Sequence, residues 1–176
     1  MYCILDLETT GINQFRDQPI EIGAILVDQN FEIIDRFHSY MQISSDLRFT
    51  DSARKTHGLT ENFLSNKSSQ RAVLNRFFLK FGTNFRFVAW NMTFDVGFFR
   101  KMCFDNGYIQ DFDRLNYRHI DLQSIFFFYC ERRGIRNLRS LDDACQHFEI
   151  PRSRYHNALE DAEITYKLFK KLIFNE

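Results

Sequence analysis

The sequence predicts an α/β domain built on a mixed β-sheet, and two observations indicate this class. The first part of the chain holds three apolar runs with short connections, which is typical of an antiparallel meander. After residue 69, apolar residues recur at helical spacing, and helical segments alternate with short strand-like runs. The chain has 176 residues, 44% of them hydrophobic. This is enough to bury one core, and we expect a single domain over residues 1–176.

The meander is predicted from hydrophobic patterning. Residues 2–7 and 20–27 are apolar runs of strand length. A turn signal at residues 28–30 follows the second run, and alternation resumes at Phe31 and Ile33. These segments predict the first three strands of the sheet.

The remaining elements follow from helical spacing and from stop signals. Val73, Phe77 and Phe81 recur once per helical turn. Ser140 and Asp143 resemble a capping box at the start of a short helix. The predicted elements after the meander are, in order, a helix over 69–81, a strand over 85–90, a helix over 94–106, a strand over 119–122, a helix ending near Gly134, the short helix closed by Pro151, and a last helix over 157–174.

Composition excludes several classes of protein. Lys and Arg number 23, Asp and Glu also 23, so the zero net charge gives no basic footprint for nucleic acid. No apolar run approaches 18 residues and the N-terminus lacks a basic region before its apolar run, so we expect neither a membrane span nor a signal peptide, and a cytoplasmic location. Cys-x-x-Cys motifs are missing, which predicts buried, reduced thiols at Cys3, Cys103, Cys130 and Cys145.

Acidic residues carry the chemistry. Asp6 and Glu8, two positions apart at the end of the first strand, leave the same face of the sheet. Asp161 lies on the apolar face of the last helix, where an unpaired carboxylate is costly. Asp95 lies in the first turn of its helix and shares a face with Phe98. Together they predict a four-carboxylate cluster, whose all-oxygen ligands suit Mg²⁺ or Mn²⁺ rather than zinc.

One histidine stands beside this cluster. His156 precedes Asp161 by five residues, at or just before the helix start. An imidazole next to a metal–carboxylate site is a natural base for water. Taken alone, the same residue also fits a surface or capping role.

These residues form three motifs that resemble those of the DEDDh 3′→5′ exonucleases, the family of the polymerase III proofreading subunit. The motifs are DLETTG at 6–11, NxxFD at 91–95 and HNALxDA at 156–162, and HGLT at 57–60 resembles a further loop motif. The resemblance covers residues 2 to about 172. It implies a ribonuclease H-like fold, with a five-stranded mixed sheet in the order 3-2-1-4-5 and helices on both faces.

The resemblance also implies a mechanism with two divalent cations about 3.5–4 Å apart. Asp6 would bridge both ions, Glu8 and Asp161 would complete the ion that activates water, and Asp95 would hold the second. His156 would accept the proton of the attacking water, and a 5′-mononucleotide would leave from a single-stranded 3′ end of DNA or RNA.

Substrate contacts are implied in the same way for Thr9, Thr10, Gly11, His57, Asn91 and Phe94. Phe94 fits a place beside the terminal base or a role in anchoring its helix. The family often has His before the Asn of the second motif, whereas this chain has Trp90, which fits either base stacking or the core. The Arg-rich stretch 132–154 fits a phosphate track or a solvated face.

Two alternatives to an active exonuclease stay open. The chain fits a catalytically silent ribonuclease H-like adaptor that binds nucleic acid or a protein, and less well a phosphoesterase for small molecules. Only 15 residues follow Asp161, so we expect a stand-alone enzyme rather than one in a stable polymerase complex. The sequence does not indicate an oligomeric state.

Overall fold

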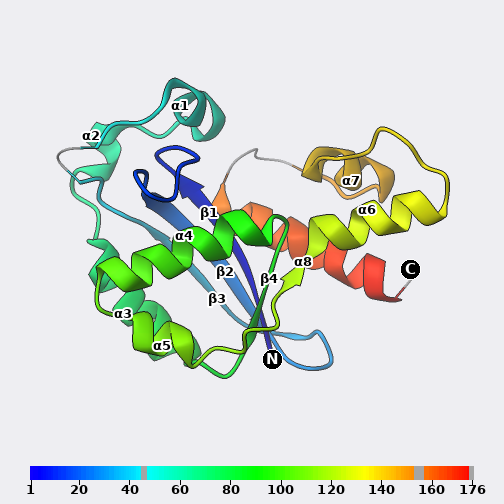
Figure 1. Ribbon diagram of the computed structural model, residues 1–176, viewed down its shortest axis with the longest axis horizontal. Helices are drawn as coiled ribbons and strands as arrows, with labels where there is room; N and C mark the ends of the chain where they lie inside the picture. Colours follow the sequence, from blue (N-terminus) through cyan, green and yellow to red (C-terminus); the bar gives the residue numbers. More distant parts are fainter. Residues whose placement is uncertain (45–46, 153–156, 175–176) are drawn as a thin grey trace.

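The computed structural model describes residues 1–44, 47–152 and 157–174 (Figure 1). Its sheet has five strands in the order β3-β2-β1-β4-β5. The predicted strand order is therefore confirmed. The strands are β1 (Tyr2–Thr9), β2 (Pro19–Val27), β3 (Ile33–Tyr40), β4 (Arg86–Ala89) and β5 (Ile120–Asp121).

The sheet is mixed, as predicted. β1, β2 and β3 form the antiparallel meander, while β4 pairs parallel with β1 and β5 pairs parallel with β4. The pairing of β1 with β4 extends only from Tyr2 to Ile4 on β1. Most of β1 beyond Ile4 therefore has a strand neighbour on one side only, which leaves room for side chains from a helix.

Helices cover both faces of the sheet, again as predicted (Figure 1). The described helices are α1 (Asp51–His57), α2 (Glu61–Leu64), α3 (Gln70–Phe81), α4 (Met92–Asp105), α5 (Ile109–Asp113), α6 (Leu122–Arg132), α7 (Leu141–His147) and α8 (Ala158–Phe174). The hydrophobic patterning did not predict α1, α2 and α5, because helices of four to seven residues are too short to show a repeat. Thr50 and Thr60 cap the first two of them.

Alternation along β1 divides the core in two. Cys3, Leu5 and Leu7 face one core cluster, which packs against α3 and α4. Ile4 faces the other cluster, which packs against α6, α7 and α8. Asp6 and Glu8 continue the Ile4 series, so the backbone directs their side chains to the face that α8 covers.

Several local expectations were tested by these elements. The Ser140 capping box is confirmed, and all four cysteines are buried and reduced. The expected start of β3 at Phe31 was wrong: Phe31 adopts a positive φ of 64° in the turn, and its ring stacks on Tyr2. Within the described residues, no helix combines the length and the apolar character needed to span a bilayer.

Candidate active site

The strand β1 supplies two neighbouring carboxylates. Asp6 and Glu8 lie on the same face, and a shift in the β1–β2 register follows directly after Glu8. Glu8 is buried, and Asp6 is half-buried. Oxygen atoms of Asp6, Glu8 and Asp161 all lie within 4.8 Å of one another. Three of the four predicted acidic residues thus meet at one point.

Asp95 joins this group from the opposite helix layer. Its carboxylate is 4% exposed, and its Oδ1 accepts a hydrogen bond of 3.0 Å from the backbone N–H of Leu7, which lies between Asp6 and Glu8. This bond forms on the stretch of β1 that β4 does not pair. Asn91 caps the helix that carries Asp95, its side chain accepting from the Phe94 N–H. The structure therefore brings all four predicted carboxylates to the same end of β1.

Close packing of α8 on β2 places Asp161. A Cβ atom at Gly23 would lie 2.1 Å from the carbonyl carbon of Ala158, so only glycine lets the helix start rest directly on the strand. Asp161 follows one turn later on the same buried face and is 4% exposed. The predicted position of Asp161 on the apolar face of the last helix agrees with this placement, whereas Glu163 of the same helix is 39% exposed.

A fifth carboxylate holds the same helix start, and the sequence reasoning missed it. Glu21 is 1% exposed and pairs with Glu8 in the strand register. Its Oε1 accepts from Asn157 Nδ2 at 2.9 Å and lies 2.7 Å from His38 Nε2. A lone acidic residue within the apolar run Pro19–Val27 was the available signal.

Burial is the main reason that the pKa values of these acids are raised. Burial, then the neighbouring carboxylates, raise the pKa of Glu8 to about 8 and that of Asp6 well above its usual range. Burial raises the pKa of Asp95 to about 8, although the hydrogen bond from Leu7 opposes the shift. A site that disfavours its own ionised form gains most from a bound cation.

The donor set fits a hard divalent cation. Every ligand atom that the three converging side chains offer is a carboxylate oxygen, the type that Mg²⁺ and Mn²⁺ prefer. Burial, and then the neighbouring carboxylates, raise the pKa values of Asp6 and Glu8, so a bound cation would stabilise their ionised forms. The acidic cluster can therefore bind a metal ion through Asp6, Glu8 and Asp161.

Metal binding is expected to release protons near neutral pH. The folded metal-free protein keeps protons on Glu8 and Asp95 up to about pH 8, whereas the unfolded chain loses them near pH 4 to 4.5. The free energy of unfolding in EDTA should therefore fall as the pH rises between these limits. Titration calorimetry of Mn²⁺ at pH 7 in two buffers of different ionisation enthalpy should show net proton release. Equal heats in both buffers would contradict the raised pKa values.

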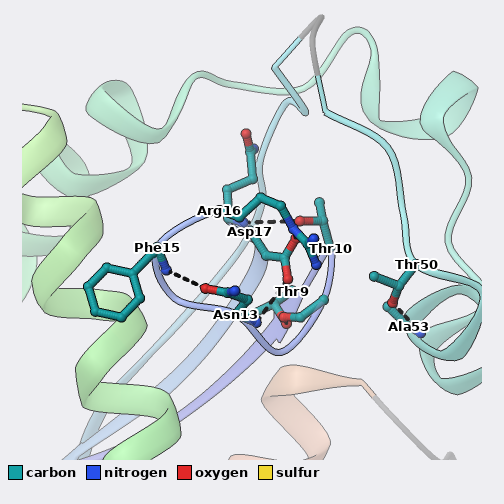
Figure 2. A network of polar contacts seen from close by, with 10 residues as sticks. Thr9, Thr10, Asn13, Phe15, Arg16, Asp17, Thr50 and Ala53 are labelled. Carbon is teal, nitrogen blue, oxygen red and sulfur yellow. Dashed lines mark hydrogen bonds and ion pairs between the residues drawn. The ribbon is translucent and has the colours of Figure 1, made fainter.

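The loop between β1 and β2 follows the strand that carries Asp6 and Glu8 and lies next to the start of α1 (Figure 2). Asp17 Oδ2 accepts from the Asn13 N–H at 2.9 Å, and a Cβ atom at Gly11 would lie 2.4 Å from that oxygen. The Thr50 N–H donates to the Thr10 carbonyl at 2.9 Å, which ties the loop to α1. The loop is thus held in one shape by its own polar groups.

A cleft of about 550 Å³ opens over the carboxylates. The implied substrate residues Thr9, Gly11, His57, Asn91 and Phe94 all line it. Thr10 does not appear among the described lining residues. Its buried Oγ1 accepts from the Gln18 N–H at 3.0 Å, so Thr10 holds the loop rather than facing the cleft.

Two aromatic residues lie partly in the core and partly at the cleft. Phe94 lines the cleft, and its ring centroid is 4.9 Å from that of Phe98. Trp90 lines it as well and packs on Phe126. Each residue can therefore contact a base in the cleft and pack against the core from the same position.

The Arg-rich stretch divides in the structure. Arg132, Arg133, Arg136 and Arg139 are exposed, while Arg152 lies in the cleft with its side chain only 7% exposed. Arg154 lies outside the described residues, as does His156, the predicted base. Nothing in the sequence distinguished Arg152 from the other five arginines.

The fold of this chain is shared with known nucleases. Escherichia coli exonuclease I in a zinc-bound complex with single-stranded DNA superimposes with a TM-score of 0.84, at 22% identity over 99% of this chain and 40% of that one. Cell-death related nuclease 4 gives a TM-score of 0.78 at 17% identity, over 99% and 64% of the two chains. This likeness confirms the predicted ribonuclease H-like fold.

The family model for exonucleases matches residues 3–169, and the chain belongs to this family. It is 32% identical over 178 residues to DNA polymerase III subunit epsilon of Buchnera aphidicola subsp. Baizongia pistaciae, covering 94% of this chain and 68% of that protein. It is also 30% identical over 174 residues to the PolC-type DNA polymerase III of Thermotoga petrophila, covering 98% of the chain but 12% of that protein. The family resemblance read from the motifs, and the exonuclease class of the enzyme, are confirmed.

Proposed function

We propose that this chain is a metal-dependent 3′→5′ exonuclease that releases 5′-mononucleotides from single-stranded ends. The observation that carries the proposal is the convergence of Asp6, Glu8 and Asp161, with oxygens within 4.8 Å, in a cleft that also holds Asp95. A silent adaptor has no need for four clustered carboxylates, three of them buried and one half-buried. The assignment of residues 1–176 to a single exonuclease domain stays a prediction.

Two divalent cations, Mg²⁺ or Mn²⁺, are part of this proposal. Asp6, Glu8 and Asp161 would hold one, and Asp95 with Asp6 the other. When bound, such ions neutralise the phosphate oxygens and make water a better nucleophile at neutral pH.

The chain's own residues bind and orient the substrate. Thr9, Gly11, Asn91 and Phe94 would receive the terminal nucleotide, and the hydrogen-bonded loop beside α1 keeps the first two in place. His156 would take the proton from the attacking water. It is adjacent in sequence to Asn157, whose amide is fixed on Glu21.

Digestion of labelled oligonucleotides tests the proposal. With Mn²⁺ or Mg²⁺, a 5′-labelled single strand should shorten one nucleotide at a time, and a 3′-labelled one should release its label as a mononucleotide at once. The Asp161→Ala variant serves as the inactive comparison. If neither DNA nor RNA is shortened, or if the variant digests equally well, the proposed function is wrong.

The substrate preference and a possible polymerase partner are tested in two further experiments. Matched DNA, RNA and very short oligonucleotides in the same assay would give the polymer preference. Because the two relatives described above are polymerase III proteins, a pull-down with a replicative polymerase would show whether this chain works alone. A stable complex would contradict the stand-alone expectation.

A further inference from the structure

Arg152 places a permanent positive charge inside the acidic cleft. Its Nη2 donates to Asp161 Oδ1 at 2.6 Å, and its Nη1 forms an ion pair with Asp142 Oδ1 at the start of α7. The Arg152 side chain is 7% exposed, whereas that of Asp142 is 58% exposed. The guanidinium therefore links a cluster carboxylate to a carboxylate outside the cluster.

This position makes Arg152 a competitor for the cluster. The oxygen it occupies belongs to Asp161, one of the three side chains that converge on the candidate metal position. A guanidinium stays charged at any working pH. A divalent cation that binds the same carboxylate meets a like charge a few ångströms away, and this repulsion is strong in a partly desolvated site. Arg152 and the cation thus oppose each other at Asp161.

The same residue is suited to a second partner. Arg152 is the only Arg or Lys among the described residues that line the cleft. Its planar fork matches the oxygens of a phosphate group, and such charge-assisted pairs are stronger than neutral hydrogen bonds. Once Asp161 binds a metal ion instead of Arg152, the ion pair with Asp142 would keep the guanidinium in the cleft.

We propose that Arg152 exchanges partners as the site fills. It neutralises Asp161 in the metal-free protein, and in the metal-loaded protein it stays on Asp142 and binds a phosphate of the nucleotide in the cleft. The second half rests on the proposed function. The first half concerns metal binding alone.

Metal affinity tests the first half without any turnover. The Arg152→Gln protein, stripped with EDTA, should bind Mn²⁺ roughly 3- to 10-fold more tightly than wild type in titration calorimetry, because the competing charge is gone. Arg36→Gln is the matched control, because Arg36 pairs at 3.1 Å with Glu163, which lies on the outer face of α8, the helix that also carries Asp161. It should leave Mn²⁺ affinity unchanged. Equal or weaker Mn²⁺ binding by Arg152→Gln overturns the exchange.

Binding of a 5′-mononucleotide tests the second half. In saturating Mn²⁺, Arg152→Gln should weaken the affinity for a 5′-mononucleotide by about tenfold, the usual loss for one charge-assisted bond. Arg152→Lys should recover part of that affinity, and the matching nucleoside, which lacks the phosphate, should bind all proteins alike. Unchanged mononucleotide affinity overturns this half.

These titrations separate the two proposals. If the wild-type protein has no nuclease activity, the proposed function is wrong. The affinities of wild type and Arg152→Gln for Mn²⁺ and for the mononucleotide can still be compared, and they still test the exchange of partners. Melting curves in Mn²⁺ confirm that each variant is folded. Should Arg152→Gln fail to fold, Asp142→Asn replaces it in the mononucleotide titration, where losing the anchor should weaken binding and an unchanged affinity would again contradict the proposal.

Discussion

The Asp6→Asn protein is expected to lose at least about 10²-fold in exonuclease rate, the size of effect seen when one preorganised electrostatic group is removed. The reason is its central place in the cluster, where burial and the charges of Asp95, Glu8, Asp161 and Glu21 all raise the pKa of Asp6. Asparagine keeps the shape of the side chain and removes the charge that a cation needs.

The same substitution should raise stability in the absence of metal. Without metal, folded wild type must either bury a charged Asp6 or keep it protonated, and asparagine avoids both costs, so the melting temperature of the variant in EDTA should exceed that of wild type. Added Mn²⁺ should stabilise wild type and leave the variant almost unchanged. Thermal melts with EDTA and with Mn²⁺ measure both effects.

Asp35→Asn is the control for this pair of effects. Asp35 is 46% exposed and pairs with Lys80, and this contact lowers the pKa of Asp35. Its loss should leave the rate and the response to Mn²⁺ as in wild type. An Asp6→Asn protein that is less stable in EDTA, or that keeps its rate, would contradict the role given to the cluster.

Gly23→Ala should have the second large effect, this time through packing. The added methyl group would overlap the Ala158 backbone, so α8 must move away from β2, at a cost of about 1–3 kcal/mol in the free energy of unfolding. Because Asp161 lies one turn into α8, the shift should also weaken Mn²⁺ binding. Urea denaturation and calorimetry measure the two losses.

A second glycine offers a matched comparison. At Gly97 in α4 the atoms nearest to the new methyl group would be those at the end of the flexible Gln14 side chain, which can move aside by giving up its 2.8 Å hydrogen bond to the Thr93 carbonyl. Alanine is also favoured over glycine inside a helix by about 1 kcal/mol. Gly97→Ala should therefore be near neutral or stabilising, and equal losses at both glycines would show that the contact with α8 is not the cause.

Hydrophobic periodicity was sufficient for the long elements. The predicted helices over 69–81, 94–106 and 157–174 each differ by two residues or fewer from the observed ends. The sheet order came from the family resemblance rather than from periodicity. The short helices α1 and α5 were beyond such an argument, since each spans too few turns for a repeat to emerge.

Part of the active site could be predicted from the sequence, and part of it depends on the tertiary structure. The spacing of Asp6 and Glu8 and the helical face of Asp161 follow from local geometry, which the sequence contains. Glu21 and Arg152 act through partners far along the chain or in another element, and only the register of β2 and the packing of α7 bring them to the cluster. The hydrogen bond that Thr10 Oγ1 accepts within the loop could not be predicted either, because it depends on the fold of the loop around it.

The location of the bound metal tests the account most directly. Anomalous diffraction at the manganese edge, from crystals grown with Mn²⁺ and a 5′-mononucleotide, should show manganese bonded to Asp6, Glu8 and Asp161, with Arg152 turned to the phosphate. Manganese bound elsewhere, or absent while Arg152 remains on Asp161, would contradict the central claim that this carboxylate cluster is the metal centre of an exonuclease.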